Sequence, residues 1–139
     1  MKIYAVIDTN VLVSALLDKN NSSPTVQVVE RIFDETIIPL YHKDILKEYK
    51  EVLHRSKFHF DSNSVDEFLQ VFERLGMEVN PAPSGEIFPD IDDLIFYEIA
   101  LDKQTDDAYL VTGNLKHYPK KKFVVTPKEM IEIIAETEK

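Results

Sequence analysis

Residues 2–10, KIYAVIDTN, combine a short apolar run with an abrupt change to polar residues, and this stretch decides the fold. Residues 2–7 are rich in apolar and β-branched side chains, which is typical of a short buried strand. The run ends at Asp8, and residues 11–17 then have the composition of a short helix. A strand that leads directly into a helix is the opening unit of an α/β fold.

The same alternation of strands and helices continues along the chain. Further strands are predicted at 36–39, 77–79, 109–112 and 123–125, and helices at 24–33, 42–53, 64–75, 92–102 and 127–135. The polar segment 18–23 and the proline-containing segment 81–89 are predicted loops. Ser64 with Glu67, and Thr126 with Glu129, have the spacing of capping boxes. We therefore expect a single domain over residues 1–139, a three-layer α/β/α sandwich around a mainly parallel sheet.

The composition excludes several classes of protein. The chain has no cysteine, which rules out disulfides, thiolate catalysis and cysteine-ligated zinc. No apolar run approaches the roughly 18–20 residues of a membrane span, and the start, MKIYAVID, becomes acidic too early for a signal peptide. These features predict a soluble cytoplasmic protein that is not bound to a membrane. The formal net charge of −9 argues against a nucleic-acid binder, whose usual surface is basic.

Acidic and polar residues follow two of the predicted strands. Asp8 and the segment 112–114 both lie just beyond a strand end, and in parallel α/β sheets sites form at the carboxyl ends of the strands. Asp8 could also be an ordinary helix cap. Glu48 lies nearest the edge of the apolar stripe of its helix, whereas Asp44 and Glu51 lie further toward solvent. Glu48 is therefore the acid of this helix best placed to lean over a buried site.

The segment 90–93, DIDD, carries the strongest acidic signal. Asp93 shares its helix face with Phe96 and Tyr97, and Asp92 shares its face with apolar residues in the same way. An acid on a core-facing stripe is costly unless it is paired, caps a helix or binds a metal. Capping would explain one of these acids, so a second one predicts a nearby cation.

Acids from separate segments, without clustered histidines or cysteines, predict a metal site made of oxygen ligands. The four histidines lack the spacing of a metal site and are interpreted as ordinary polar residues. Oxygen ligands select Mg²⁺ or Mn²⁺, which can activate a water and neutralise the leaving oxygen of a phosphodiester. The ions would also separate the acids from phosphate. The candidate nucleic-acid contacts are Arg55, Lys57, Lys116 and Lys120, although the pattern of the lysine-rich segment favours a solvated loop.

Five segments, in order, resemble the PIN-domain family, and more narrowly the toxin components of bacterial type II toxin–antitoxin pairs. They are IDTNVLVSALL at 7–17, ILKEYKEVLHRSKF at 45–58, DIDDLIFYEIAL at 90–101, DAYLVTGNLKHYP at 107–119 and FVVTPKEMIEII at 123–134. The resemblance spans essentially the whole chain. It implies a metal-dependent ribonuclease that acts on RNA, is often a homodimer, and is silenced by a small antitoxin protein that covers the site.

The resemblance also implies roles for individual residues. Asp8, Glu48 and Asp93 correspond to the catalytic acids that hold Mg²⁺ or Mn²⁺. The positions expected to support them are Thr9, Asn10, Ser14 and Thr112, to which the neighbouring acid Asp92 is added. Many PIN nucleases have aspartate where this chain has Asn114. Asn114 is therefore expected to be a neutral metal ligand, with a weaker second metal or a one-metal site as the consequence.

Two other interpretations remain open. The first is a PIN-fold module that binds RNA or a protein with little catalysis, which Asn114 and the acidic net charge favour. The second is a haloacid-dehalogenase-like phosphatase with Asp8 as its nucleophile. That class requires a partner acid two positions later, where this chain has Asn10, and 139 residues leave no room for a cap insertion.

Overall fold

The computed structural model describes residues 2–19 and 22–139 and has an α/β architecture. Its strands are β1 (Ile3–Ile7), β2 (Ile37–Tyr41), β3 (Met77–Glu78), β4 (Tyr109–Val111) and β5 (Val124–Val125). Its helices are α1 (Thr9–Leu17), α2 (Pro24–Phe33), α3 (Lys43–Leu53), α4 (Ser62–Leu75), α5 (Ile91–Asp102) and α6 (Pro127–Thr137). Three short 3₁₀ turns complete the description: η1 (Ser56–Phe58), η2 (Gln104–Asp106) and η3 (Leu115–His117).

The strands form one sheet in the order β3-β2-β1-β4-β5, and every pairing is parallel. The central strand β1 pairs with β2 on one side and with β4 on the other, so Ala5 lies opposite both Pro39 and Tyr109. All carboxyl ends therefore meet at one edge of the sheet. Asp8 and Thr112 become neighbours at this edge, although 104 positions separate them in the sequence.

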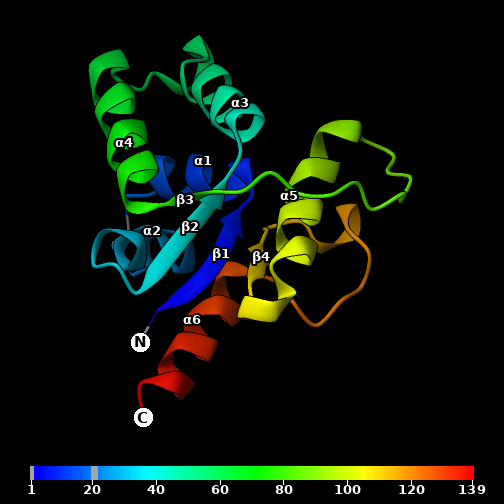
Figure 1. The fold of residues 1–139 in the computed structure, drawn as a ribbon. Coiled ribbons are helices and arrows are strands. Elements are labelled where there is room, and N and C mark those ends of the chain that lie inside the picture. Colours follow the sequence, from blue (N-terminus) through cyan, green and yellow to red (C-terminus); the bar gives the residue numbers. More distant parts are fainter. Residues whose placement is uncertain (1, 20–21) are drawn as a thin grey trace.

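Helices cover both faces of the sheet (Figure 1). Figure 1 shows α5 in front of the sheet, over β4, and α1 and α2 behind it. α5 contacts β1 and β4, whereas α2 contacts β2 and packs against α1 and α6. Every β1 residue is buried or half-buried, as expected of a central parallel strand covered on both faces. The predicted three-layer α/β/α sandwich is confirmed.

Aromatic packing brings α3, α4 and α5 together near the end of β1. Tyr49 of α3 contacts Phe72 of α4 edge-on, with ring centroids 5.3 Å apart, and lies 6.3 Å from Phe96 of α5. These three side chains are fully buried. The Tyr49 hydroxyl donates a hydrogen bond to the carbonyl of Ile7, which is the last residue of β1. This contact holds α3 beside the strand end that precedes Asp8.

The ends of the elements differ from the predictions in a few places. The Ser64–Glu67 capping box is wrong: α4 begins at Ser62, and the carboxylate of Asp61 accepts the Ser64 amide at 2.9 Å. Asp61 is the capping residue because its carboxylate lies where the free amides of the first helical turn point. The Thr126–Glu129 box is confirmed, with both of its hydrogen bonds present. Part of the predicted loop 18–23 lies outside the described residues.

Within residues 2–19 and 22–139, no helix combines the length and the apolar composition that a bilayer crossing requires.

Candidate active site

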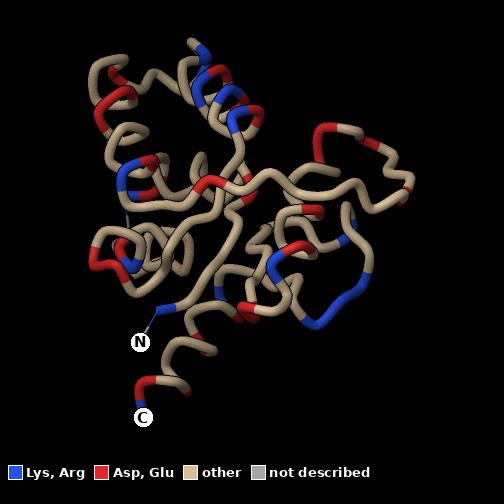
Figure 2. The backbone as a smooth tube through the Cα atoms, viewed as in Figure 1, with Lys and Arg blue, Asp and Glu red and all other residues tan. Residues whose placement is uncertain are grey.

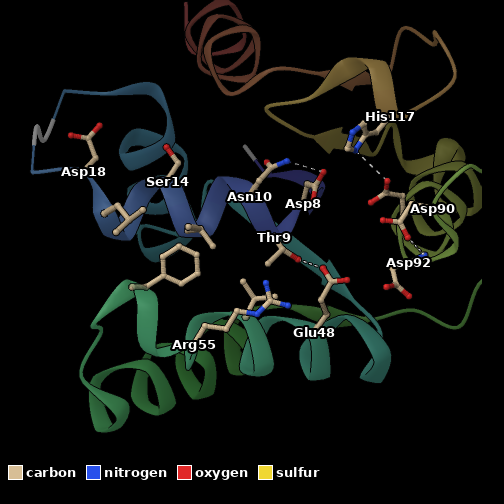
Figure 3. A pocket seen from close by; sticks show the side chains of 15 residues that line it. Asp8, Thr9, Asn10, Ser14, Asp18, Glu48, Arg55, Asp90, Asp92 and His117 are labelled. Carbon is tan, nitrogen blue, oxygen red and sulfur yellow. Dashed lines mark hydrogen bonds and ion pairs between the residues drawn. The ribbon is translucent and has the colours of Figure 1, made fainter.

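A cleft of about 750 Å³ opens at the carboxyl end of β1 (Figure 3). Its walls come from the whole length of α1, from α3 and the turn after it, from the start of α5, and from η3. Six titratable side chains line one half of it: Asp8, Glu48, Asp90, Asp92, Asp93 and His117. The three acids predicted from distant segments, at positions 8, 48 and 93, therefore share one cavity.

Asp8 is held by hydroxyl groups. Its Oδ2 atom accepts hydrogen bonds from Thr112 Oγ1 at 2.8 Å and from the Tyr118 hydroxyl at 3.1 Å. The Asn10 amide lies 3.4 Å from the same oxygen. Asp8 occupies the capping position of α1, but its side chain makes no capping hydrogen bond. Asp8 is therefore held mainly by its hydroxyl partners at the cleft, and the backbone amides of Thr9 and Asn10 also lower the pKa of its carboxyl.

Glu48 leans into the cleft from α3. The Thr9 hydroxyl donates a hydrogen bond to Glu48 Oε2, which ties α3 to the start of α1. Glu48 is half-buried, whereas Asp44 and Glu51 of the same helix are exposed. Glu48 is thus the acid of α3 that turns inward, as the position of the apolar stripe predicted.

Asp93 and Asp92 lie at the start of α5, and Asp90 precedes the helix. Asp90 is the capping residue, because its Oδ1 accepts the Asp92 amide at 3.0 Å. The other two carboxylates are therefore not needed as caps. Asp93 Oδ2 lies 3.3 Å from His117 Nδ1, and its side chain is 17% exposed. Figure 3 shows His117 above this acidic wall of the cleft.

The acids of the cleft disfavour one another's charge. Burial raises the pKa of Asp8, against the opposing hydrogen bonds from Thr112 and Tyr118. Burial, followed by the charge of Asp8, raises the pKa of Asp93 to about 6. Burial raises the pKa of Glu48 as well, and the charges of Asp8, Asp92 and Asp93 add to that effect. In the described part of the chain, no lysine or arginine lies within ion-pair distance of any of these three acids.

One known protein family matches most of the chain. The family model of the PIN domain matches residues 4–116. This chain belongs to the PIN domain family. An uncharacterized protein of Methanocaldococcus jannaschii, MJ1680, is 30% identical over 117 residues, which cover 82% of this chain and 72% of that relative. The crystal structure of PAE2754 from Pyrobaculum aerophilum matches with a TM-score of 0.57 at 14% identity, over 97% of this chain and 90% of that one, and shows a likeness of fold.

PIN domains are generally nucleases, act on nucleic acid and typically use divalent metals. Membership of this family leaves the dehalogenase-like interpretation without support, and Asn10 is bound to Asp8 and to the Gly113 amide. The donors of this PIN domain fit Mg²⁺ or Mn²⁺, since several carboxylates that no described lysine or arginine pairs with share the cleft. As the side chains lie, however, no three His, Asp or Glu residues among those described are grouped as ligands of one ion. Asp8, Glu48 and Asp93 are instead each held by a different partner.

The predicted supporting residues are placed around the acids. Thr9 and Thr112 are buried and bind Glu48 and Asp8. Asn10 accepts the Gly113 amide at 3.2 Å and so ties the start of α1 to the segment after β4. Ser14 lines the cleft, and its hydroxyl lies 3.3 Å from that of Thr25.

The prediction that Asn114 faces the metal is not supported. Its amide nitrogen lies 2.9 Å from His117 Nε2, and Asn114 lines a smaller hollow beside Thr25 rather than the cleft. The backbone amide of Asn114 donates to Thr112 Oγ1 at 3.0 Å, which fixes this residue beside the end of β4. Asn114 therefore orients His117 instead of facing the acids.

The predicted basic contacts divide between two places. Arg55 lines the cleft, and the Lys57 amine lies 5.1 Å from the centre of the Phe58 ring at its rim. Lys116 and Lys120 instead line a separate hollow of about 540 Å³ next to β5. Figure 2 shows lysines as a continuous blue stretch on the loop before β5. The four residues therefore do not form one continuous basic surface.

Two residues of the site escaped the sequence analysis. His117, interpreted there as an ordinary polar residue, contacts Asp93 and lines the cleft. Tyr118 was given no role at Asp8, yet its buried hydroxyl binds that carboxylate. Both lie within seven residues of the end of β4, which is where side chains of a parallel sheet gather at a site. Their position shortly after β4 is the sequence feature that could have identified them as residues of the site.

Proposed function

We propose that this PIN domain is a metal-dependent ribonuclease that hydrolyses RNA phosphodiester bonds in the cleft at the end of β1. The observation that carries the proposal is the meeting of Asp8, Glu48 and Asp93 from three distant segments, where no described lysine or arginine neutralises them. Like charges held together in a partly buried cleft raise the free energy of the protein. A bound divalent cation removes this cost, which accounts for acids that the fold alone does not need.

The three carboxylates are the proposed ligands of Mg²⁺ or Mn²⁺, with Asp92 beside them. Such an ion lowers the pKa of a bound water and neutralises the leaving oxygen of the phosphodiester. Thr112 and Tyr118 both bind Oδ2 of Asp8 and so fix the direction of this carboxylate. Thr9 orients Glu48 in the same way. Because Asn114 turns toward His117, a one-ion site is the simpler arrangement.

The competing function is a PIN-fold module that binds RNA or a protein with little catalysis. The net charge of −9, the orientation of Asn114 and the absence of a close group of three ligands among the described residues favour it. The toxin role, the antitoxin partner, the homodimer and the cytoplasmic location remain predictions of the sequence analysis. None of them is needed for cleavage by the cleft.

The deciding experiment is cleavage of a labelled single-stranded RNA as Mn²⁺ or Mg²⁺ is titrated. Wild type should cleave with a saturable metal dependence, and Asp93→Asn should lose at least about 100-fold in rate because the loss of a charged ligand weakens the metal site. Asp106→Asn, an exposed acid in η2, is the matched control and should cleave normally. Equal rates for wild type and Asp93→Asn with Mn²⁺ present would leave the binding module as the better function.

A further inference from the structure

The cleft has a second half that the acids do not explain. Its apolar walls are Val13 and Leu17 of α1, Val52 of α3 and Phe58 of η1, and its polar lining is Arg55, which follows α3, with Ser14 and Asp18 at the α1 side. Leu17 is 50% exposed, so this apolar surface is open to solvent. A volume of about 750 Å³ is far larger than one metal ion needs and lies in the usual range of ligand pockets. We call Val13, Leu17, Val52 and Phe58 the apolar half of the cleft.

Arg55 lies at the boundary between the two halves. Figure 3 shows its side chain extending from the region after α3 toward Thr9 and Glu48. Its carboxylate partner is Glu51, at 3.6 Å, one helical turn earlier and 70% exposed. A solvated pair of this kind contributes little free energy. The guanidinium is therefore available to a ligand anion beside the acidic half.

The turn after α3 adds an aromatic ring and a second cation. Phe58 stacks on Phe60 with ring centroids 5.6 Å apart and an interplanar angle of 17°, which orients the ring at the cleft wall. The Lys57 amine lies over the same ring. Apolar walls, an aromatic ring and a cation, adjoining a phosphodiester-cleaving centre, are the features that bind an unpaired base together with its phosphate.

We propose that the apolar half of the cleft binds the base of a nucleotide next to the scissile bond of single-stranded RNA, and that Arg55 binds the phosphate between that base and the acids. The proposal deepens the proposed function and rests on it. A paired base cannot reach Phe58 and Leu17, because a duplex keeps its bases stacked inside the helix. The cleft therefore selects unpaired RNA, and Phe58 contributes to affinity rather than to the chemical step.

The test measures binding of a fluorescent single-stranded RNA by anisotropy in EDTA, and KM and kcat for its cleavage in Mn²⁺. Phe58→Ala should weaken binding and raise KM about 5- to 100-fold, the range for loss of one base contact, with a much smaller change in kcat. Phe58→Tyr keeps the ring and should bind like wild type. Arg55→Ala should also raise KM. The matched controls are Phe33→Ala and Arg74→Ala, which alter partly exposed or exposed residues of α2 and α4 outside the cleft lining.

A second measurement separates base recognition from an effect on folding. It uses a set of RNAs in which each member lacks the base of a single nucleotide. The nucleotides chosen are the two on either side of the cleavage site. One of them should bind wild type weakly, and Phe58→Ala should cause no further loss with that RNA, because the base that the ring contacts is already missing. Double-stranded RNA should compete poorly with the single strand.

Several results would overturn this subsite. They are unchanged KM and affinity in Phe58→Ala, equal further losses with every base-deleted RNA, and stronger binding of duplex than of single strand. If wild type cleaves RNA while Phe58→Ala behaves normally, the subsite fails and the nuclease function stands. If wild type neither binds nor cleaves RNA, the proposed function itself fails, and the subsite falls with it.

Discussion

Replacing Asp93 by asparagine should make the metal-free protein more stable while it removes the proposed activity. The pKa of Asp93 rises from 3.8 to about 6, first because of burial and then because of the charges of Asp8 and Asp90, whereas His117 acts in the opposite direction. At about 1.4 kcal/mol per pKa unit, this rise corresponds to about 3 kcal/mol. Solvent in the open cleft screens part of it, so we expect Asp93→Asn to gain about 1–2 kcal/mol at pH 7.5.

The sign of the pH dependence follows from proton binding. An unfolded aspartate titrates near pH 4, so between about pH 4 and 6 the folded protein binds more protons than the unfolded chain at Asp93. The free energy of unfolding of wild type should therefore fall as pH rises through this window. Asparagine does not titrate. The advantage of Asp93→Asn should be complete above pH 7 and should vanish near pH 4.

The assay is thermal and urea unfolding in EDTA at pH 4 and at pH 7.5. A gain of about 1–2 kcal/mol corresponds to a rise in Tm of roughly 3–8 °C for a chain of this size. Asp106→Asn, which changes an exposed acid in η2, should shift stability by less than about 0.5 kcal/mol. A variant no more stable than wild type at pH 7.5, or one with an equal gain at both pH values, would refute the reasoning that these acids repel one another.

Two further substitutions test how the site and the sheet are held. Tyr118→Phe removes only the hydroxyl that binds Asp8 at 3.1 Å. The affinity for Mn²⁺, measured by calorimetry, should therefore fall about tenfold, while the circular dichroism spectrum stays unchanged. An affinity equal to that of wild type would show that this hydroxyl does not position the carboxylate. Gly76→Ala would bring a Cβ within 2.5 Å of the Pro39 carbonyl, and urea unfolding should show a loss of roughly 1–3 kcal/mol. Gly113→Ala, whose Cβ would meet Asn10 Oδ1 at an ordinary 3.4 Å, should lose less than about 1 kcal/mol, and equal losses would contradict the steric argument.

Several features of this PIN domain could be predicted from short stretches of sequence. The apolar run before Asp8 became the central strand, and Thr126 with Glu129 formed the predicted capping box. The helical stripe also predicted that Glu48, rather than Asp44, leans inward. Each of these depends on residues a few positions apart, whose relative directions follow from the geometry of a strand or a helix. The start of α4 was misplaced because Asp61, three residues before Ser64, caps the helix, and only the folded backbone decides between two capping residues this close.

The partners of the acidic side chains were decided only by the tertiary structure. The Asp8–Tyr118 hydrogen bond joins residues 110 positions apart, and the contact of His117 with Asp93 depends on how η3 packs beside α5. The side chain of Asn114 contacts His117 instead of lining the cleft. The sequence by itself therefore determined where strands end and which acids follow them. The register of the sheet and the packing of distant segments determined which groups meet, since the direction of a side chain across space depends on contacts that local periodicity does not contain.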